Sequence, residues 1–330
     1  MEPDADEVVF DAPGYFCMYK SGKIVRVSQP LAAAGVDDTS GVSSKDIVLD
    51  ADTGLSVRLF LPRRQGPSGK KLPVLVYFHG GGFLIGSAKF ATYHNYLTSL
   101  ASAAGVLAVS VDYRLAPEHQ LPAAYDDCWA ALQWAASAQD DWIAEHGDAG
   151  RVFVAGDSAG GNIVHNVLMK ASTGGSSADN GGGAPRIEGA VFLHAFFGGR
   201  TLIDGEPERA VAIAEKVWTF ACRDAADGAD DPWINPTAPG APSLERLGCQ
   251  RVLVCAAEKD WLAARDRAYY AALVDSAWPG SAEWLESSGE EHVFFVTKPE
   301  CENAKQLMDR VNDKDIINCF QAMKTRHRAD

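Results

Sequence analysis

The sequence lacks long apolar runs and an excess of positive charge. No stretch approaches the ~18 consecutive apolar residues that a membrane-spanning helix needs. Acidic side chains number 44 against 30 lysines and arginines, which leaves a formal net charge of −14. Such a surface repels phosphate backbones and anionic lipids. We therefore expect neither nucleic-acid nor membrane partners.

Paired cysteines and targeting signals are missing as well. The chain has seven cysteines, an odd number, and none of them forms a CxxC pair, so neither a zinc site nor a redox pair is indicated. Scattered thiols fit a reducing compartment best. The N-terminal stretch MEPDADEVVF has neither the basic nor the apolar part of a signal peptide. We therefore expect a cytoplasmic protein, with access to the nucleus left open.

Eight short apolar runs, rich in β-branched residues, alternate with segments of helical period. The runs lie at 47–50, 57–61, 73–78, 106–111, 151–155, 188–194, 251–256 and 282–286. The helical segments lie at 89–103, 122–138, 160–171, 262–277 and 300–323. This alternation predicts an α/β fold with a mostly parallel eight-stranded sheet flanked by helices. The first two runs alternate polar with apolar residues, which favours an antiparallel edge.

Three segments do not follow the alternation. Residues 172–185 are of low complexity and predict a surface loop. Residues 200–245 separate two strands and contain a helical pattern at 206–223. Ligands of open α/β sheets bind beyond the carboxyl ends of the strands, where such an insertion would lie. We interpret 1–45 as an N-terminal cap segment and 46–330 as the core, with a cap insertion at about 200–245.

The stretch GDSAGGN at 156–162 follows a buried strand and precedes a predicted helix. Gly156-x-Ser158-x-Gly160 fits a nucleophile elbow, in which a sharp turn between small residues exposes the serine hydroxyl. The alternative is a small-residue loop where a helix packs closely on a strand. The motif is short, so the rest of the chain must decide between these two interpretations.

A nucleophilic serine needs a base, and the base needs an orienting acid. Of the eight histidines, His292 lies in a polar loop after the last predicted strand, SSGEEHVFF. Asp260 follows the strand RVLVCA, and Asp266 and Glu258 are close alternatives for the acid. The order Ser158, Asp260, His292 matches the order expected for a nucleophile elbow of this kind.

The stretch HGGGF at 79–83 supplies candidate donors for an oxyanion. Successive glycines let backbone N–H groups approach a ligand oxygen without a Cβ in the way. The alternative is a phosphate-binding loop. The glycine spacing is one residue too long for a dinucleotide fingerprint, however, and no GK[ST] follows.

At this point the chain resembles a known family. HGGGF, DYRLAPEHQLPAAYDD at 112–127 and GDSAGGN resemble the hormone-sensitive-lipase branch of the α/β-hydrolases. The stretches at 10–27, 41–62 and 230–260 are similar to plant carboxylesterases, relatives of the gibberellin receptor. The resemblance covers almost the whole chain and implies an α/β-hydrolase fold with a cap built partly from the N-terminal segment.

The resemblance also implies roles for individual residues. Ser158 would be the nucleophile, His292 the base and Asp260 the orienting acid. The oxyanion hole would be made by the N–H groups of Gly81, Gly82 and Ala159. Asp157, Arg114 and Glu118 would form a structural network that supports the elbow.

We therefore expect a serine carboxylesterase that acts on small esters, as a monomer or a homodimer, with no cofactor and no metal. Phe83, Leu84 and Ile85 follow the glycines and are candidate walls of the substrate pocket; the alternative is that they belong to the core. Trp261 directly follows the acid, so it would narrow the pocket or change how Asp260 is held.

Two other functions stay open. Gibberellin receptors are similar in sequence and bind a hormone without turnover, but that resemblance would expect an aliphatic residue in place of His292. Members of the family also act as dehydratases or lactone-forming enzymes, and base chemistry at His292 would suit proton abstraction next to a carbonyl. The sequence does not separate these reactions from hydrolysis.

Overall fold

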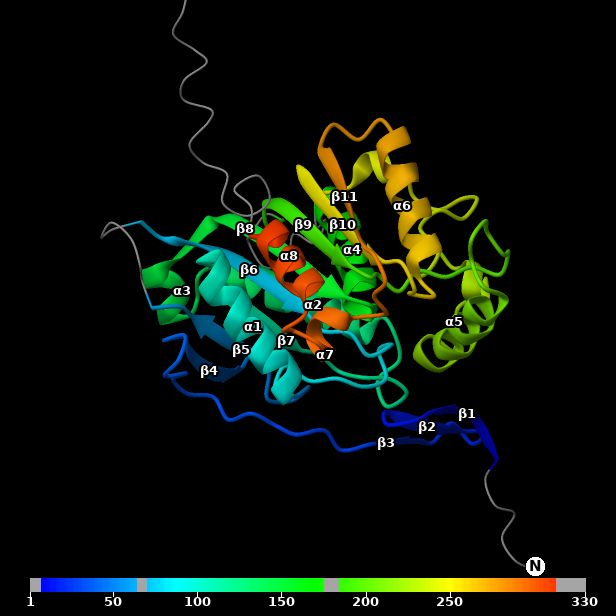
Figure 1. The fold of residues 1–330 in the computed structure, drawn as a ribbon, viewed down its shortest axis with the longest axis horizontal. Coiled ribbons are helices and arrows are strands. Elements are labelled where there is room, and N and C mark those ends of the chain that lie inside the picture. The colour runs from blue at the N-terminus through cyan, green and yellow to red at the C-terminus, as the bar shows by residue number, and fades with distance from the viewer. Residues whose placement is uncertain (1–6, 64–69, 175–183, 313–330) are drawn as a thin grey trace, which may run out of the picture.

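The computed structural model describes residues 7–63, 70–174 and 184–312. Its centre is an eight-stranded sheet with the strand order β11-β10-β9-β8-β6-β7-β5-β4 (Figure 1). The strands are β4 (Ser43–Val48), β5 (Ser56–Leu61), β6 (Leu72–Phe78), β7 (Leu107–Asp112), β8 (Gly147–Asp157), β9 (Ile187–Leu193), β10 (Arg251–Ala257) and β11 (Ser281–Ser287). All eight predicted runs are therefore strands of one sheet.

The sheet is parallel from β11 to β7, and only β4 and β5 run antiparallel to their neighbours. This confirms the mostly parallel sheet and the antiparallel edge. The inner strands are mostly apolar because helices cover both faces of the sheet. The residues of β9, for example, are all buried.

Helices pack on both faces of the sheet. One face is covered by α1 (Ala91–Ala104), α7 (Phe294–Thr297) and α8 (Glu302–Val311). The other is covered by α2 (Ala123–Ala136), α3 (Asp141–His146), α4 (Ala159–Ser172) and α6 (Ala263–Asp275). The helix predicted at 300–323 is seen as α8, and residues 313–323 lie outside the described residues. The short α3 was not predicted, because six residues show too little periodicity.

Two further segments lie outside the central sheet. In the N-terminal segment, β1 (Val8–Ala12), β2 (Phe16–Tyr19) and β3 (Ile24–Arg26) form a small antiparallel sheet that the sequence did not predict. The segment 200–245 contains α5 (Glu208–Ala221), η1 (Gly228–Asp230) and η2 (Leu244–Arg246).

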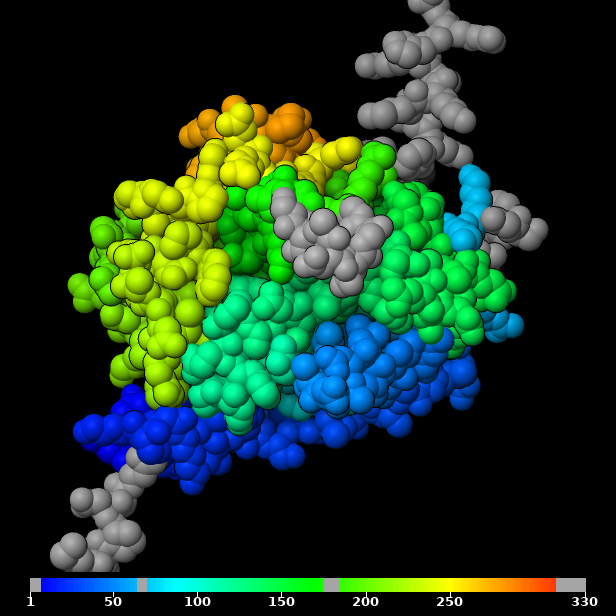
Figure 2. Space-filling view, turned by 180° about the vertical axis from the view of Figure 1, so that it is seen from behind, coloured from blue at the N-terminus to red at the C-terminus, as the bar shows by residue number. Residues whose placement is uncertain are grey.

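The two segments meet at the molecular surface, where the blue and yellow-green regions of Figure 2 adjoin. Lys216 Nζ of α5 donates a hydrogen bond to the carbonyl of Val9, at 3.3 Å. Of the loop predicted at 172–185, residues 175–183 lie outside the described residues.

Candidate active site

Ser158 lies at the turn between β8 and α4. Its backbone angles, φ 52° and ψ −117°, fall where residues other than glycine are rarely found. The turn needs glycines around it, since a Cβ at Gly156 would lie 2.4 Å from the carbonyl carbon of Gly160, and one at Gly160 would lie 1.9 Å from the carbonyl oxygen of Phe78. The backbone of Ser158 is held on both sides, because its N–H donates to the carbonyl of Leu193 and its carbonyl accepts from Phe196.

His292 lies between Ser158 and Asp260. Its Nε2 is 3.0 Å from Ser158 Oγ, and its Nδ1 is 2.6 Å from Asp260 Oδ2. A carboxylate only accepts hydrogen bonds, so Nδ1 donates, and Nε2 of the neutral ring is left to accept the serine proton. Each of the three residues follows the carboxyl end of a strand: β8, β10 and β11. The arrangement meets the geometric needs of a nucleophile, its base and an orienting acid.

Asp260 and His292 each stabilise the charged form of the other. Burial disfavours the charged form of Asp260, but the charge and hydrogen bond of His292 outweigh it and hold the carboxyl pKa below its usual range. Burial also disfavours charged His292, and Asp260 outweighs that effect and raises the imidazole pKa. An imidazolium formed by proton transfer from Ser158 is therefore stabilised where it arises.

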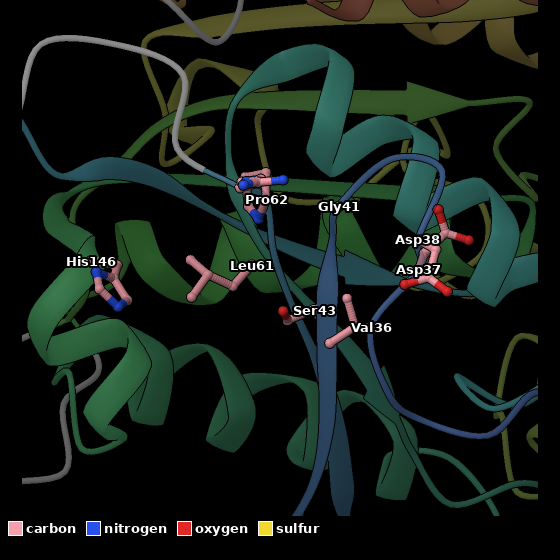
Figure 3. Close-up of a pocket in the computed structure, with 9 residues that line it drawn as sticks. Val36, Asp37, Asp38, Gly41, Ser43, Leu61, Pro62 and His146 are labelled. Carbon is pink, nitrogen blue, oxygen red and sulfur yellow. The ribbon is translucent and has the colours of Figure 1, made fainter.

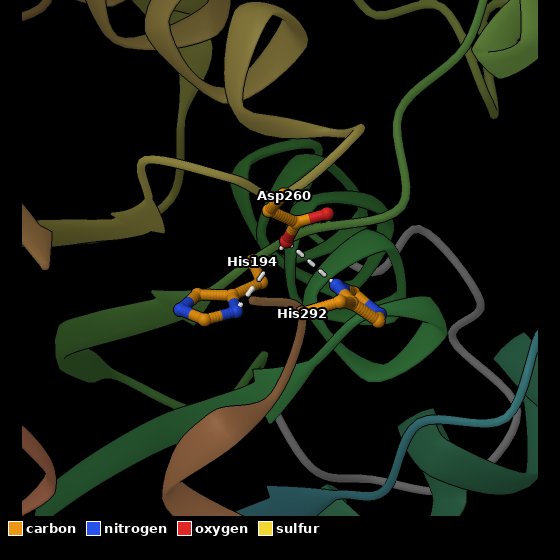
Figure 4. Close-up of side chains that lie close together, drawn as sticks. All are labelled: His194, Asp260 and His292. Carbon is orange, nitrogen blue, oxygen red and sulfur yellow. Dashed lines mark hydrogen bonds and ion pairs between the residues drawn. The ribbon is translucent and has the colours of Figure 1, made fainter. Parts of the chain in front are cut away.

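A second histidine adjoins the acid (Figure 4). His194 is fully buried, and its Nδ1 lies 3.4 Å from Asp260 Oδ2. Burial lowers the pKa of His194 to about 3, so this contact is not an ion pair at neutral pH. The Nδ1 atom instead accepts the backbone N–H of Val293 at 2.9 Å, which ties the residue after His292 to the end of β9. The sequence analysis did not single out this tether, because a strand-end histidine has no distinguishing local pattern.

His194, Asp260 and His292 also offer nitrogen and oxygen atoms that all lie within 4.8 Å of one another, as metal ligands do. Their hydrogen bonds give a different account of the cluster. Asp260 Oδ2 accepts from His292, and His194 Nδ1 accepts from Val293. One carboxylate oxygen and one ring nitrogen of each histidine are therefore engaged in hydrogen bonds or in a contact within the cluster.

The glycine loop after β6 leaves backbone donors without acceptors. Gly81 and Gly82 have φ values of 110° and 61°, which favour glycine. A Cβ at Gly81 would also lie 2.2 Å from the carbonyl oxygen of Ile85. Across residues 7–63, 70–174 and 184–312, no group accepts a hydrogen bond from the N–H of Gly81, Gly82 or Ala159. Unpaired N–H groups on this loop and at the start of α4 suit an oxyanion site.

Asp157 joins this loop to the elbow. Its Oδ1 accepts hydrogen bonds from Tyr77 Oη at 2.7 Å and from the backbone N–H of Gly80 at 3.0 Å, and its Oδ2 accepts from Tyr93 Oη at 2.9 Å. Burial raises the pKa of Asp157, while the two tyrosine hydrogen bonds act in the opposite direction. Asp157, the residue before Ser158, therefore fixes the position of Gly80 at the start of the glycine loop.

The two other residues of the predicted network form ion pairs. Arg114 makes a bidentate pair with Asp127, whereas Glu118 pairs with Arg26 from the N-terminal sheet. Neither contacts Ser158 in these pairs, and Arg26 carried no recognisable motif in the sequence.

The two alternative acids lie away from His292. Asp266 on α6 is fully buried, and burial together with the nearby charge of Asp260 raises its pKa well above the usual range, while the backbone N–H of Ala195 acts in the opposite direction. Glu258 is exposed and accepts from Ser288 Oγ and from the N–H of Gly289. Among these three carboxylates, only Asp260 has a hydrogen bond to His292.

The candidate pocket residues differ in burial. Phe83 and Leu84 are buried in the core, and the Phe83 ring packs edge-on against Trp218 of α5. Ile85 and Trp261 are partly exposed, and the Trp261 ring centroid lies 6.2 Å from that of His292. The pocket role of these four residues stays a prediction.

A separate groove of about 440 Å³ lies beside Ser43 at the start of β4 and Leu61 at the end of β5 (Figure 3). Its lining includes Asp37, Ser43, Arg63 and His146. Ser158 is not among its lining residues, so this groove is distinct from the constellation described above.

In the described part of the chain, no helix combines the length and apolarity that crossing a bilayer requires. Residues 75–296 match the protein family described as "alpha/beta hydrolase fold".

The chain is also similar to named plant proteins and to a solved esterase. It is 46% identical over 299 residues to "Tuliposide A-converting enzyme 1, chloroplastic" of Tulipa gesneriana, which covers 88% of this chain and 74% of the tulip protein. It is 42% identical over 320 residues to "Probable carboxylesterase 13" of Arabidopsis thaliana, covering 92% and 96% of the two chains. The structure of the hyperthermophilic esterase from Pyrobaculum calidifontis aligns with a TM-score of 0.65 at 27% identity, covering 83% and 85%.

Proposed function

The chain belongs to the alpha/beta hydrolases, as a plant carboxylesterase related to hormone-sensitive lipase, and on this premise we propose that it hydrolyses small carboxylic esters through an acyl-enzyme on Ser158. The observation that carries this proposal is the hydrogen-bonded series from Ser158 Oγ through His292 to Asp260. Nucleophile, base and acid lie within hydrogen-bond reach of one another, as acyl transfer requires.

The proposed reaction has two halves. Ser158 Oγ attacks the ester carbonyl carbon while its proton passes to His292 Nε2. The oxyanion accepts hydrogen bonds from the N–H groups of Gly81, Gly82 and Ala159. Collapse of this intermediate breaks the bond to the alcohol, which leaves with the proton from His292. Water then attacks the acylated serine by the same route and releases the carboxylic acid.

The first test is turnover of p-nitrophenyl acetate, butyrate and octanoate by the wild type, Ser158→Ala and His292→Ala. Each variant should lose ester turnover by several orders of magnitude, on the order of 10⁴–10⁶. Ser137→Ala and His146→Ala are the matched controls, because Ser137 is exposed at the end of α2 and His146 lines the separate groove, and they should keep full activity.

Melting curves of all four variants separate loss of chemistry from loss of fold. Near-wild-type activity in Ser158→Ala or His292→Ala would refute the assignment. A wild type that binds ligands without any serine-dependent turnover would favour the receptor alternative.

A second reaction at the same site is supported by the tulip relatives, which are named for converting tuliposide A. In the lactone-forming alternative, a hydroxyl on the acyl chain takes the place of water and attacks the acylated serine. A hydroxyacyl ester distinguishes the reactions, since hydrolysis yields the hydroxy acid, internal transfer yields a lactone, and elimination leaves an alkene. Chromatography of the products after complete turnover decides between them.

The site of action and the assembly state remain predictions. We propose a cytoplasmic protein on the sequence grounds given above, although the tulip relatives are named as amyloplastic or chloroplastic. A fluorescent fusion of the full-length protein in plant cells tests the compartment. Sedimentation of the purified protein tests the expected monomer or homodimer.

A further inference from the structure

Arg26 lies at the end of β3, far along the chain from the residues proposed to react, yet its guanidinium reaches the glycine loop. We propose that Arg26 is a positioning residue that holds the oxyanion loop in its working geometry. This inference rests on the proposed function, because it concerns the loop that carries Gly81 and Gly82.

The guanidinium of Arg26 uses most of its donors. Nε donates to the backbone carbonyl of Leu84 at 2.5 Å, and one terminal nitrogen donates to the carbonyl of Ala116 at 2.8 Å. The two terminal nitrogens also bind both carboxylate oxygens of Glu118, each at 2.7 Å. Because the guanidinium is planar and rigid, its hydrogen bonds fix the carbonyls of Leu84 and Ala116 and the carboxylate of Glu118 relative to one another.

The carbonyl of Leu84 lies at the C-terminal end of the turn that carries Gly81 and Gly82. The N–H groups of Leu84 and Ile85 both donate to the carbonyl of Gly81, at 3.0 Å, which closes a tight turn. The preceding carbonyl, that of Phe83, accepts the N–H of Ala116 at 2.9 Å. Two successive carbonyls of the turn are therefore held from outside it, one by Arg26 and one by the segment that Arg26 also binds.

The same segment is bound by the cap insertion. Leu121 N–H donates to the carbonyl of Ala221 at 2.9 Å, and Gln120 Nε2 donates to the carbonyl of Phe220 at 3.0 Å. From the same helix, α5, the side chain of Val217 lies 3.1 Å from where a Cβ of Gly82 would be. The residues 114–122 thus form a junction where the N-terminal sheet, α5 and the oxyanion turn meet.

Stability is not the main effect expected of these contacts. The side chains of Arg26 and Glu118 are 29% and 54% exposed, and an ion pair so open to water contributes little to folding. The two carbonyl contacts are different, because one acts on the turn that carries Gly81 and Gly82 and the other acts on Ala116, whose N–H donates to that turn. A displacement of about 1 Å in a reacting site can lower the rate by about 10²-fold.

The test compares Arg26→Gln, Arg26→Lys and Glu118→Gln in p-nitrophenyl acetate turnover. Lysine keeps the charge opposite Glu118 but cannot reach both carbonyls and the carboxylate at once. Both Arg26 variants should lower kcat by about tenfold, a fraction of the loss from removing an oxyanion donor, with KM changed less than about twofold. Glu118→Gln should stay within about threefold of the wild type, since the carbonyl contacts remain.

Lys20→Gln is the matched control in the turn between β2 and β3, because Lys20 is exposed and forms an ion pair with Glu7 at the surface. A boronic acid that mimics the tetrahedral intermediate should bind the Arg26 variants about tenfold more weakly and bind Lys20→Gln unchanged. Full kcat in Arg26→Lys would overturn the proposal, because charge alone would then suffice. An equal loss in Glu118→Gln would overturn it too, because the ion pair would then carry the effect.

Hydrogen exchange gives a readout that does not depend on turnover. Amides of residues 80–86 should exchange about tenfold faster in Arg26→Gln, while those of 290–293 stay as in the wild type. Unchanged exchange at 80–86 would refute the positioning role. If the wild type shows no serine-dependent turnover, the proposed esterase function fails, and the exchange result still decides whether Arg26 holds the loop.

Discussion

At the scale of single residues, burial and hydrogen bonding separate Asp260, the candidate acid, from Asp266, which the sequence leaves as a close alternative. Asp260 and Asp266 are both almost fully buried, but of the two only Asp260 has a hydrogen bond to His292. The partner holds the pKa of Asp260 low, whereas burial raises the pKa of Asp266 well above its usual range. The environment therefore favours the charged form of Asp260 and disfavours the charged form of Asp266.

Asp260→Asn should lower kcat/KM for p-nitrophenyl acetate by about 10⁴-fold, because an amide no longer orients the imidazole through a charged acceptor. Asp266→Asn should stay within about threefold of the wild type. Initial rates at pH 7.5 for the two isosteric variants make the comparison. The reverse order of activities would move the role of the acid to Asp266.

Asp266→Asn also has an expected effect on stability. A carboxyl whose folded pKa is raised contributes stability below its unfolded pKa, near 4, and loses it as pH rises towards the folded pKa. Replacing it with a neutral amide removes this loss. The variant should gain free energy of unfolding relative to the wild type between pH 5 and 8, as measured by urea titration. A variant that is equally destabilised at every pH would contradict the raised pKa.

At the scale of elements, the insertion between β9 and β10 is attached to α6 by a buried ion pair. Arg265 of α6 binds both carboxylate oxygens of Glu206, at 2.8 Å and 2.7 Å, and also donates to the carbonyl of Thr201. The two side chains are only 6% and 3% exposed. Because α6 begins just after Asp260, this pair joins the insertion to the segment that carries the acid. The cap role of the insertion stays a prediction.

Breaking that pair from one side should be costly, because it leaves a buried charge without a partner. Arg265→Met should lower the free energy of unfolding by about 3–5 kcal/mol. The double variant Arg265→Met with Glu206→Leu should recover a large part of that loss, since no charge is then left buried. Urea titration of the wild type, both single variants and the double variant completes the cycle. A double variant with the summed loss of the two single variants would show that the pair is not coupled.

At the scale of the whole molecule, two neutral histidines are built into the interior on either side of β9. The Nδ1 atom of His165 on α4 lies 3.1 Å from Tyr269 Oη. The Nδ1 atom of His194, at the end of β9, accepts a hydrogen bond from the backbone N–H of Val293. Burial lowers the pKa of each to about 3. The unfolded chain binds protons at both histidines near pH 6.5, whereas the folded protein does not.

Stability should therefore fall as pH drops from about 6.5 towards 3, with up to roughly 1.4 kcal/mol lost per pH unit for each histidine. Urea titrations at pH 7 and pH 5 measure the loss. In His165→Gln the loss between these pH values should be smaller than in the wild type. Met169→Leu on the same helix removes no titratable group, so it is the control and should leave the pH dependence unchanged. An identical loss in His165→Gln and the wild type would mean that this ring does not resist protonation.

The order of the elements was predictable, because each depends on a local pattern. Apolar β-branched runs revealed all eight strands of the main sheet, and the alternating character of the first two marked the antiparallel edge. The small sheet β1–β3 was not predicted, since its short strands are half exposed and show little periodicity.

The candidate site was only partly predictable. Glycine-rich turns are recognisable from adjacent residues, so Ser158 and Gly81 could be predicted as site residues from the sequence. His194 and Arg26 were missed, because their roles depend on backbone atoms remote in the chain, those of Val293 and Leu84.

The sequence by itself determined the sheet, the elbow and the chain order of Ser158, Asp260 and His292, because backbone conformation follows nearby residues. Only the tertiary structure decided which acidic side chain meets His292, that Phe83 and Leu84 are buried in the core, and that Arg26 reaches the carbonyl of Leu84. These outcomes depend on how strand ends and loops pack together. A contact between residues far apart in the chain exists only once the intervening sheet has brought them within hydrogen-bond reach.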